Sequence, residues 1–382
     1  MKKFFFFTTL ILSGCSIQAP FIRPGSPERV PAISSDSLLY TILLIGDAGE
    51  PLPDGKETNF TILTRHAAEN PRNTTIVFLG DNVYPKGLPD TLSSERKEME
   101  RRLDEQIAIA ERSGAFGLFV PGNHDWEYQG EDGLATLKRQ EEFITAKHLM
   151  NVTMLPRDGY PGPSIIDITD SIRIIAIDTQ WWLHAFDKPL YNGDTCEAQT
   201  KKRFLDSLSR VLSTSKKTIV AAHHPIESYG EHGGFFDWRD HIFPFRKLFH
   251  WLWLPLPGIG SLYPLSRMMG ISNQDFSGER YEELRRQLDS VLTRSTPVAY
   301  VAGHEHALQV LDRRSRHWYL VSGKGIQMHT EALTYGDRTI FASRGTGFMR
   351  LDFALDGSVR LGVIEATEDT VRGREVFSMM LH

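Results

Sequence analysis

The chain has 382 residues, with 43 Lys and Arg against 48 Asp and Glu, a net charge of −5, 41% hydrophobic residues and two cysteines. This length allows one large domain or two to three smaller ones, and the ordinary hydrophobic fraction excludes a mainly disordered chain. The slightly acidic balance argues against a nucleic-acid partner, and two cysteines exclude both a disulfide-rich scaffold and a cysteine-based zinc cluster.

The first residues of the chain have the order of an export signal. Lys2 and Lys3 precede an apolar run that is too short to span a bilayer, and small residues follow it. The segment Leu12-Ser13-Gly14-Cys15 also resembles the bacterial lipobox, in which the cysteine receives lipid and becomes the first mature residue. We therefore predict a signal peptide at 1–14 and an exported bacterial lipoprotein, on the outer membrane or the periplasmic face of the cell envelope. An ordinary signal peptide with a chance cysteine is the alternative.

Residues 15–37 are rich in proline and carry no regular apolar pattern. This composition predicts a lipid-anchored flexible tether outside the fold. If Cys15 carries lipid, Cys196 has no cysteine left with which to form a disulfide.

From Leu38 onward, short β-rich apolar runs alternate with amphipathic stretches, which predicts an α/β fold with a substantial parallel component. The predicted buried strands are 39–45, 75–79, 115–120, 172–177, 218–222 and 297–302, and the predicted helices are 59–69, 93–112, 201–212 and 278–292. After His304 the strands become closely spaced, at 319–321, 339–343, 347–353 and 359–365, which suggests a second, antiparallel-rich sheet.

Polar clusters follow many of these strands, at the edge where open α/β sheets bind ligands. Each cluster supplies Asp, Asn, Tyr or His, often beside a glycine that lets the backbone approach closely. Oxygen donors together with imidazole suit Fe, Zn or Mn in a two-metal site, and the lack of cysteine ligands argues against an iron–sulfur cluster. The clusters are Gly46-Asp47-Ala48-Gly49, Gly80-Asp81-Asn82-Val83-Tyr84, Gly122-Asn123-His124-Asp125, Val220-Ala221-Ala222-His223 and Gly303-His304-Glu305-His306.

In this order, the five clusters resemble those of the calcineurin-like metallophosphoesterase superfamily, and within it the small, tartrate-resistant type of purple acid phosphatase. Most of the superfamily has a histidine where this chain has Gly49, and an aspartate where it has Tyr84. The two departures together preserve the number of ligands, and this paired change is the purple-phosphatase pattern. The resemblance spans 38–365. It implies a single domain over 38–382, built as a four-layer α/β/β/α sandwich with two mixed sheets flanked by helices.

The resemblance also implies two metal ions, Fe(III) plus Fe(II), Zn(II) or Mn(II). One ion would be held by Asp47, Asp81, Tyr84 and His306, and the other by Asp81, Asn123, His223 and His304, with Asp81 bridging.

Two further histidines are candidates for stabilising the phosphate oxygens and protonating the leaving group. His124 adjoins the predicted ligand Asn123, and His232 lies in a Glu-His-Gly triplet that is similar to the small purple phosphatases. A structural hydrogen bond for His124 and an ordinary loop position for His232 are the alternatives. His224 stays unassigned, and Asp125 is expected to orient His124 or to cap the following helix rather than bind metal.

An aromatic-rich insert at about 235–278 makes the chain longer than a small purple phosphatase. Its prolines and glycines exclude a transmembrane helix. Two interpretations stay open. The insert is either an apolar lid near the site entrance or a membrane contact, since its aromatic residues together with Arg246, Lys247 and Arg267 are a set that partitions to lipid headgroups.

The predicted activity is hydrolysis of small phosphate monoesters. A phosphodiesterase, or a nucleotide or pyrophosphate hydrolase, on the same metals is the enzymatic alternative, and a metal-dependent surface binding protein without turnover is the non-enzymatic one. The predicted partners are a small phosphate ester and the membrane, with no nucleic acid, and the sequence leaves the oligomeric state and the natural substrate open.

Overall fold

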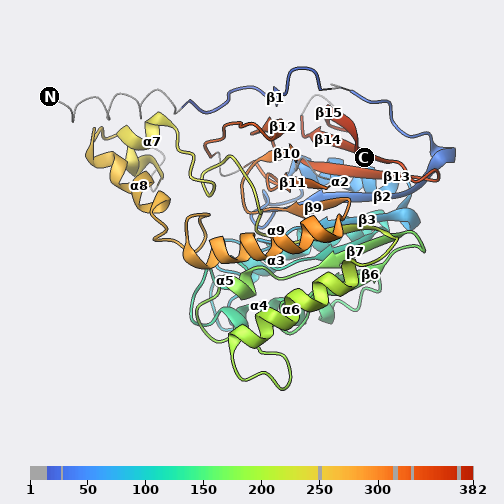
Figure 1. Cartoon of the computed structure of the whole chain (residues 1–382), viewed down its shortest axis with the longest axis horizontal. Helices are drawn as coiled ribbons and strands as arrows, with labels where there is room; N and C mark the ends of the chain where they lie inside the picture. Colours follow the sequence, from blue (N-terminus) through green and yellow to red (C-terminus); the bar gives the residue numbers. More distant parts are fainter. Residues whose placement is uncertain are drawn as a thin grey trace.

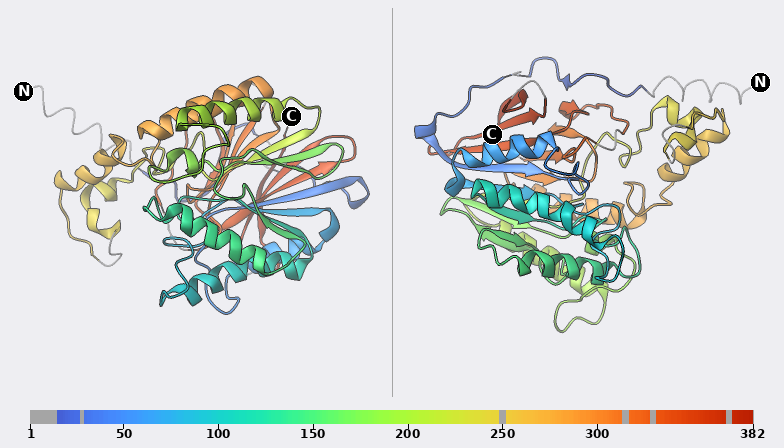
Figure 2. Two further views of the ribbon diagram at one scale, coloured as in Figure 1. Left: turned by 90° about the horizontal axis from the view of Figure 1, so that it is seen from below. Right: turned by 180° about the vertical axis from the view of Figure 1, so that it is seen from behind.

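The computed structural model describes residues 15–26, 29–247, 252–312, 317–327, 331–367 and 371–381. Within these residues the chain forms two mixed sheets that pack face to face, with helices on both outer faces (Figures 1 and 2). This arrangement confirms the predicted four-layer fold class.

One sheet has seven described strands, in the spatial order β15-β14-β13-β2-β3-β4-β5. The strands from β2 to β5 are parallel to one another, and β13 to β15 are antiparallel additions beside β2. Their bounds are β2 Leu38–Ile45, β3 Thr74–Phe78, β4 Phe116–Phe119, β5 Val152–Met154, β13 Gly347–Ala354, β14 Val359–Glu365 and β15 Arg374–Leu381.

The second sheet has eight described strands, in the order β1-β12-β10-β11-β9-β8-β7-β6. Strands β7, β8, β9 and β11 are parallel, and the strands at both ends of the sheet are antiparallel. Their bounds are β1 Phe21–Ile22, β6 Ser164–Asp167, β7 Ile172–Ala176, β8 Lys217–Ala221, β9 Ala299–Ala302, β10 Leu308–Asp312, β11 Trp318–Ser322 and β12 Thr339–Ser343.

The helices form the two outer layers. Figure 2 shows α6 and α9 along one side of the strands and α2, α3 and α4 along the other. The α-helices are α2 Thr58–Ala68, α3 Arg96–Ser113, α4 Gly133–Ala146, α5 Gln180–Leu183, α6 Glu197–Leu212, α7 Trp238–Ile242, α8 Leu262–Met268 and α9 Glu279–Ser295. Short 3-10 turns lie at η1 Ser35–Ser37, η2 Pro71–Asn73, η3 Pro244–Lys247 and η4 Ile259–Ser261. None of the described helices is both long and apolar enough to cross a membrane.

The central strands are apolar at almost every position because both of their faces are buried. In β2, Ile42 and Leu44 belong to the core between the two sheets, whereas Leu43 and Ile45 belong to the core that includes the helices. All four side chains are 0% exposed.

The prediction of a separate antiparallel sheet after His304 is wrong. Strands β10 to β12 extend the sheet that contains β9, and β13 to β15 extend the sheet that contains β2. Met349 of β13 is paired with Leu44 of β2, so a late strand covers an edge that the early parallel strands would leave unpaired.

The prediction that 15–37 is a flexible tether outside the fold is also wrong. Phe21 of β1 pairs with Ala342 of β12, and the Phe21 ring stacks on Tyr335 at 3.8 Å between centroids. Further along, the Val30 amide donates to Ser378 Oγ. The prolines do not prevent this docking, because the residues between them supply the donors and acceptors that join the sheets.

The 235–278 insert lies at one end of the molecule, where α7 and α8 project beyond the sheets (Figure 1). Its described helices are short, since α7 runs over Trp238–Ile242 and α8 over Leu262–Met268. The predicted membrane-contact residues Arg246 and Lys247 have side chains that lie outside the described part of the chain.

Candidate metal centre

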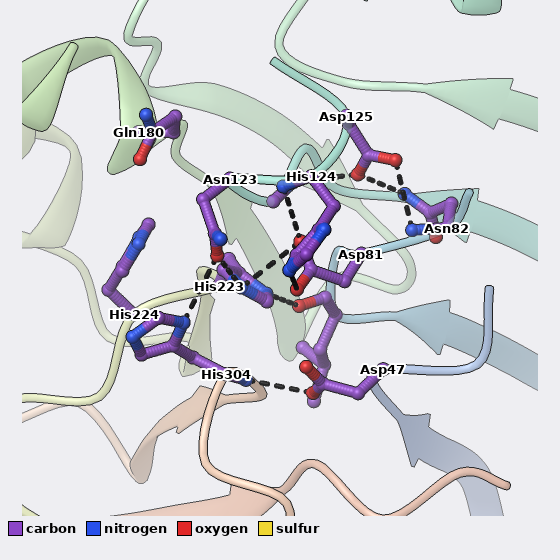
Figure 3. Close-up of polar contacts among 12 residues, drawn as sticks. Asp47, Asp81, Asn82, Asn123, His124, Asp125, Gln180, His223, His224 and His304 are labelled. Carbon is purple, nitrogen blue, oxygen red and sulfur yellow. Dashed lines mark hydrogen bonds and ion pairs between the residues drawn. The ribbon is translucent and has the colours of Figure 1, made fainter. Parts of the chain in front are cut away.

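The predicted ligands lie at the carboxyl ends of parallel strands from both sheets. Asp47 follows β2, Asp81 and Tyr84 follow β3, and Asn123 follows β4. In the other sheet His223 follows β8, while His304 and His306 lie between β9 and β10. Because these strand ends meet at one edge of the sandwich, the fold brings together side chains that are far apart in sequence (Figure 3).

Three of these residues have backbone conformations that favour glycine. The φ angles of Asp47, Asp81 and His304 are 55°, 54° and 67°. A side chain held in this region costs about 1–3 kcal/mol, and such residues gather at functional sites. The cluster therefore combines backbone strain with convergence of polar groups, as expected of a site selected for chemistry rather than for stability.

Neighbouring glycines make room for the cluster. A Cβ on Gly122 would lie 2.3 Å from Asp81 Oδ1, and a Cβ on Gly80 would lie 2.5 Å from His223 Nδ1. Neither neighbour can move away without displacing a predicted ligand. These two glycines are therefore required by the close approach of the strand-end loops.

The first group of predicted ligands surrounds the Tyr84 hydroxyl. This hydroxyl donates to Asp47 Oδ1 at 3.0 Å and lies 3.0 Å from His306 Nε2. The other ring nitrogen of His306, Nδ1, is 3.2 Å from Glu331 Oε1. Burial and the charges of Asp47 and Asp81 raise the pKa of Tyr84 well above its usual value, so the phenol is neutral without a cation nearby.

The second group surrounds the Asn123 side chain (Figure 3). Asn123 Oδ1 lies 2.9 Å from His223 Nε2 and 3.1 Å from His304 Nδ1. The opposite ring nitrogens face backbone carbonyls, with His223 Nδ1 2.8 Å from Leu79 O and His304 Nε2 2.9 Å from Gln274 O. Since carbonyls only accept, these opposite nitrogens carry the protons.

The inner nitrogens of neutral His223 and His304 are therefore acceptors, and both point at the amide oxygen of Asn123. Three acceptors that converge in a buried site repel one another unless a positive charge lies among them. The donor set thus fits a metal cation. Burial lowers the pKa of His223, but the negative charge of Asp81 outweighs burial and raises this pKa to about 9. In the metal-free protein, His223 is therefore protonated, and its ring supplies the positive charge that the converging acceptors need.

Asp81 lies between the two groups. Ligand atoms of Asp47, Asp81 and His223 are all within 4.8 Å of one another. Burial opposes ionisation of Asp81, but the charges of His223 and His124 outweigh it and hold the pKa of Asp81 well below its usual value. The carboxylate is therefore ionised and lies between the two groups of predicted ligands.

Asp125 holds the ligand loops together. Its carboxylate accepts from the backbone amides of Asn82, Val83 and Gly122, and from the side chains of Asn82 and Gln140. The described contacts include none between Asp125 and the His124 ring. The expectation that Asp125 orients His124 or caps a helix is wrong. Its carboxylate oxygens instead accept hydrogen bonds from the loops that carry Asp81 and Asn123.

His224 is close to His223 and His304, and the ligand atoms of the three histidines lie within 4.8 Å of one another. Both of its ring nitrogens nevertheless have protein partners, Thr179 Oγ1 at 2.8 Å and Gln274 Oε1 at 2.8 Å. His224 therefore positions Gln274, whose carbonyl in turn holds His304, and it is not free to bind metal.

The two predicted catalytic histidines lie at the edge of the cluster. The His124 side chain is 18% exposed, with Nδ1 2.5 Å from Pro85 O and Nε2 3.8 Å from Asp81 Oδ2. The His232 side chain is 15% exposed, and its ring centroid is 4.0 Å from that of His304. Both line one cleft of about 750 Å³ that also contains Asp81, Tyr84 and His306.

Two positioning residues were not predicted from the sequence. Gln274 belongs to the insert, and its carbonyl holds His304. Glu331 holds His306 from a segment without regular structure. Neither follows a predicted strand, so no sequence signal of the kind that marked the ligands points to them.

Comparison with solved structures agrees with the fold. GAP50, the anchor in the inner membrane complex of Plasmodium, matches with a TM-score of 0.55 at 17% identity, over 90% of this chain and 88% of that one. Purple acid phosphatase PPD1 from yellow lupin (Lupinus luteus) seeds matches with a TM-score of 0.51 at 13% identity, over 89% of this chain and 53% of that one. At these identities the likeness shows the fold alone.

No curated protein sequence matches the chain. The family model of the calcineurin-like phosphoesterases matches residues 40–308, which is more than half of the chain and contains every predicted metal ligand. The family consists of hydrolases that act on phosphate esters with a dinuclear metal site, and this chain belongs to the calcineurin-like phosphoesterase family.

Proposed function

We propose that the protein hydrolyses phosphate monoesters at a two-metal site of purple acid phosphatase type. The observation that carries this proposal is the Tyr84 hydroxyl, which lies 3.0 Å from both Asp47 Oδ1 and His306 Nε2. A phenol among the ligands is the feature that separates this type from the rest of the family.

Asp47, Asp81, Tyr84 and His306 would hold one ion, and Asp81, Asn123, His223 and His304 the other. We propose Fe(III) for the tyrosine-bearing site and Fe(II), Zn(II) or Mn(II) for the second, because oxygen and imidazole donors accept all of these ions. When bound, such a pair supplies a water of lowered pKa and a positive clamp for phosphate oxygens.

Residues of the chain would then orient the substrate and supply the proton that the leaving alkoxide needs. Because Pro85 O can only accept, it fixes the proton of His124 on Nδ1 and leaves Nε2 on the Asp81 side of the ring. His232 Nδ1 faces Gln274 O at 2.9 Å and Asp275 Oδ1 at 3.0 Å. The two imidazoles therefore line the cleft with fixed rings, placed to bind phosphate oxygens and to protonate the leaving alkoxide.

The activity is tested with p-nitrophenyl phosphate and its bis ester. Hydrolysis of the monoester but not of the bis ester is expected. Preference for the bis ester would replace the monoesterase by a phosphodiesterase, and faster release of phosphate from pyrophosphate or nucleotides would favour the anhydride alternative. Metal binding without hydrolysis of any of these compounds would favour a binding role.

We also propose that the chain is exported and attached to a membrane through lipid on Cys15. Cys15 is exposed, and the amide of the next residue, Ser16, donates to Asp237 Oδ2 of the insert at 3.3 Å. The attachment point therefore lies beside the insert. Several side chains of the insert are apolar and exposed, among them Ile259, Leu262, Leu265, Met268, Met269 and Ile271. This surface supports seating of the insert in a lipid interface, where a second signal strengthens a single anchor.

Mass spectrometry of the protein purified from membranes tests the lipid on Cys15. Flotation of residues 15–382 carrying Cys15→Ala with anionic liposomes tests the insert, since all the contacts that the structure describes lie within 15–382. Recovery of this variant with the liposomes is expected, and its loss on adding Leu262→Glu and Leu265→Glu would locate the contact. A Cys15→Ala protein that ignores liposomes would refute membrane seating.

A further inference from the structure

The cleft above the metal centre is larger than a phosphate group needs. Its volume of about 750 Å³ is in the range of sites that hold a whole small molecule, roughly 300–1,000 Å³. Five of the seven predicted ligands and the two predicted catalytic histidines line its inner part; the ligands are Asp81, Tyr84, Asn123, His304 and His306. Its outer part is lined by residues with no role in metal binding, and these include Tyr128, Arg239, Trp253, Tyr263 and Arg267.

One wall of this outer part is Tyr128, which follows β4. Its ring stacks on the His124 ring at 4.4 Å between centroids, and about half of the residue is exposed. Glu127, Tyr128 and Gln129 have φ angles of 55°, 51° and 68°, so three successive residues other than glycine lie in the left-handed region. A turn of this kind is strained, and here it presents an aromatic ring to the cleft.

Another wall belongs to the insert, which supplies Arg239, Trp253, Tyr263 and Arg267. The Arg267 guanidinium is fixed by Asp275, with Nε 2.9 Å from Oδ2, and it also donates to the Tyr263 hydroxyl at 3.2 Å. Tyr128 and Arg267 line the same cleft. Trp253 and Tyr263 supply further aromatic surface on this wall.

The charges of the cleft favour an anion in the outer part. The carboxylates have cationic or hydrogen-bonding partners, since Glu50 pairs with Arg102 at 2.9 Å and Glu231 accepts from the amide of Ala332. Arg239 differs, because its guanidinium lies over the Trp238 ring and has no carboxylate within 4.0 Å among the residues that the structure describes. An arginine that no described carboxylate neutralises, beside aromatic rings, can bind a flat anionic group.

We propose that the outer part of the cleft binds the leaving group of the substrate and selects one that carries both an aromatic ring and a negative charge, as in a nucleoside with a second phosphate. The rings of Tyr128, Trp253 and Tyr263 stack with the leaving group, and Arg239 binds its charge. This inference rests on the proposed function, because it assumes that a phosphate monoester is hydrolysed at the metal centre. It assigns the selectivity to the insert and to the Tyr128 turn.

Four phosphate monoesters test separately the aromatic ring and the negative charge of the leaving group. Glycerol 1-phosphate has neither feature, adenosine 5′-monophosphate has the ring, 3-phosphoglycerate has the charge, and adenosine 3′,5′-bisphosphate has both. With the metal-loaded full chain, each feature is expected to raise kcat/KM about tenfold, the usual scale for one base stacked on an aromatic side chain or one charge-assisted hydrogen bond.

Variants assign the features to residues. Arg239→Gln is expected to lower the kcat/KM for 3-phosphoglycerate relative to that for glycerol 1-phosphate about tenfold. Tyr128→Leu is expected to lower the kcat/KM for adenosine 5′-monophosphate relative to that for glycerol 1-phosphate about tenfold as well. Tyr335→Leu is the matched control, since Tyr335 is also 51% exposed and stacked on a ring but lies against Phe21. Arg294→Gln, on the exposed end of α9, is the control for the charge.

A binding measurement removes the dependence on turnover. Adenosine 3′-phosphate is expected to bind the chelator-treated protein, and Arg239→Gln is expected to weaken that binding about tenfold. If none of the four esters is hydrolysed, the proposed function fails. If all four are hydrolysed with kcat/KM values within about threefold of one another, the proposed function stands and the inference about the leaving group is overturned. Equal effects of the control variants would overturn it as well.

Discussion

The strand-end loops and the 235–278 insert differ in how firmly the fold holds their side chains. Among the predicted ligands, His223 is 0% and Asp47, Asp81 and Asn123 are each 2% exposed. In the insert, Met269 is 78% and Ile271 77% exposed. The buried loops carry the chemistry that the whole family shares, and the exposed insert offers surface on which this chain can differ from its relatives.

The two regions are nevertheless joined at the metal centre. The insert residue Gln274 accepts from His304, and Asp275 holds both His232 and Arg267. The insert therefore does more than cover the entrance, because its last residues position one predicted ligand and one predicted catalytic histidine. The lid interpretation of the insert is compatible with these contacts, and so is a membrane contact through its outer surface.

The largest effect is expected from Asp81→Ala. Asp81 is the residue that both predicted metal sites share, so the variant is expected to lose both ions and to lower kcat/KM by at least about a thousandfold. Metal content and p-nitrophenyl phosphate hydrolysis measure the two losses. Asp206→Ala is the control, because Asp206 is an exposed aspartate paired with Lys202. Retained activity in Asp81→Ala would refute the two-metal assignment.

A smaller effect on the same loops is expected from Gly122→Ala. Its Cβ would lie 2.3 Å from Asp81 Oδ1, so the loops must separate, and a displacement of about 1 Å can lower kcat about a hundredfold. Gly193→Ala is the comparison variant, because its new Cβ meets no atom within 4 Å although the φ of 89° at Gly193 strains an alanine there; it therefore controls for backbone strain without a clash. Equal kcat values in both variants would show that the close packing of the loops is not needed.

Glu331→Gln tests the support of His306 from outside the ligand set. The substitution keeps an acceptor near Nδ1 but removes the charge, and losses of this kind typically weaken metal binding about 10–100-fold. Competition with a chelator measures the affinity, and Glu131→Gln on the surface is the control. Unchanged affinity would limit the site to the seven predicted ligands.

The smallest effect is expected in the insert. Leu262→Glu and Leu265→Glu replace side chains that are 64% and 39% exposed, so each is expected to change the free energy of unfolding by less than about 0.5 kcal/mol. Leu44→Ala in β2 removes a side chain that is 0% exposed and is expected to cost about 2–5 kcal/mol. Urea unfolding compares them. A large loss in the insert variants would show that this surface is covered by protein.

The early strands and the predicted ligands could be predicted from the sequence because both signals are local. A strand buried on both faces gives an apolar run such as Leu38–Ile45, and the polar residue that ends it, here Asp47, follows directly in the chain. The seven predicted ligands come together in the structure because the parallel strands share one edge.

The remaining features depend on contacts between distant residues. Pairing of β13 with β2 joins Met349 to Leu44, and the docking of Phe21 depends on β12, so neither is visible in a short window of sequence. Gln274 and Glu331 act from segments without periodicity. Their partners, His304 and His306, can be predicted to be ligands, but the sequence does not indicate which residue contacts the other nitrogen of each ring.

The central claim is that converging acceptors at the strand ends hold two cations, one of them beside Tyr84. Elemental analysis of the purified full chain, together with a visible spectrum of the oxidised protein, tests it most directly. We predict two metal ions per chain, at least one of them iron. We also predict a broad violet absorption band that disappears in Tyr84→Phe. A colourless protein with two zinc or manganese ions would contradict the purple-phosphatase assignment, and a protein that binds no metal would contradict the metal centre itself.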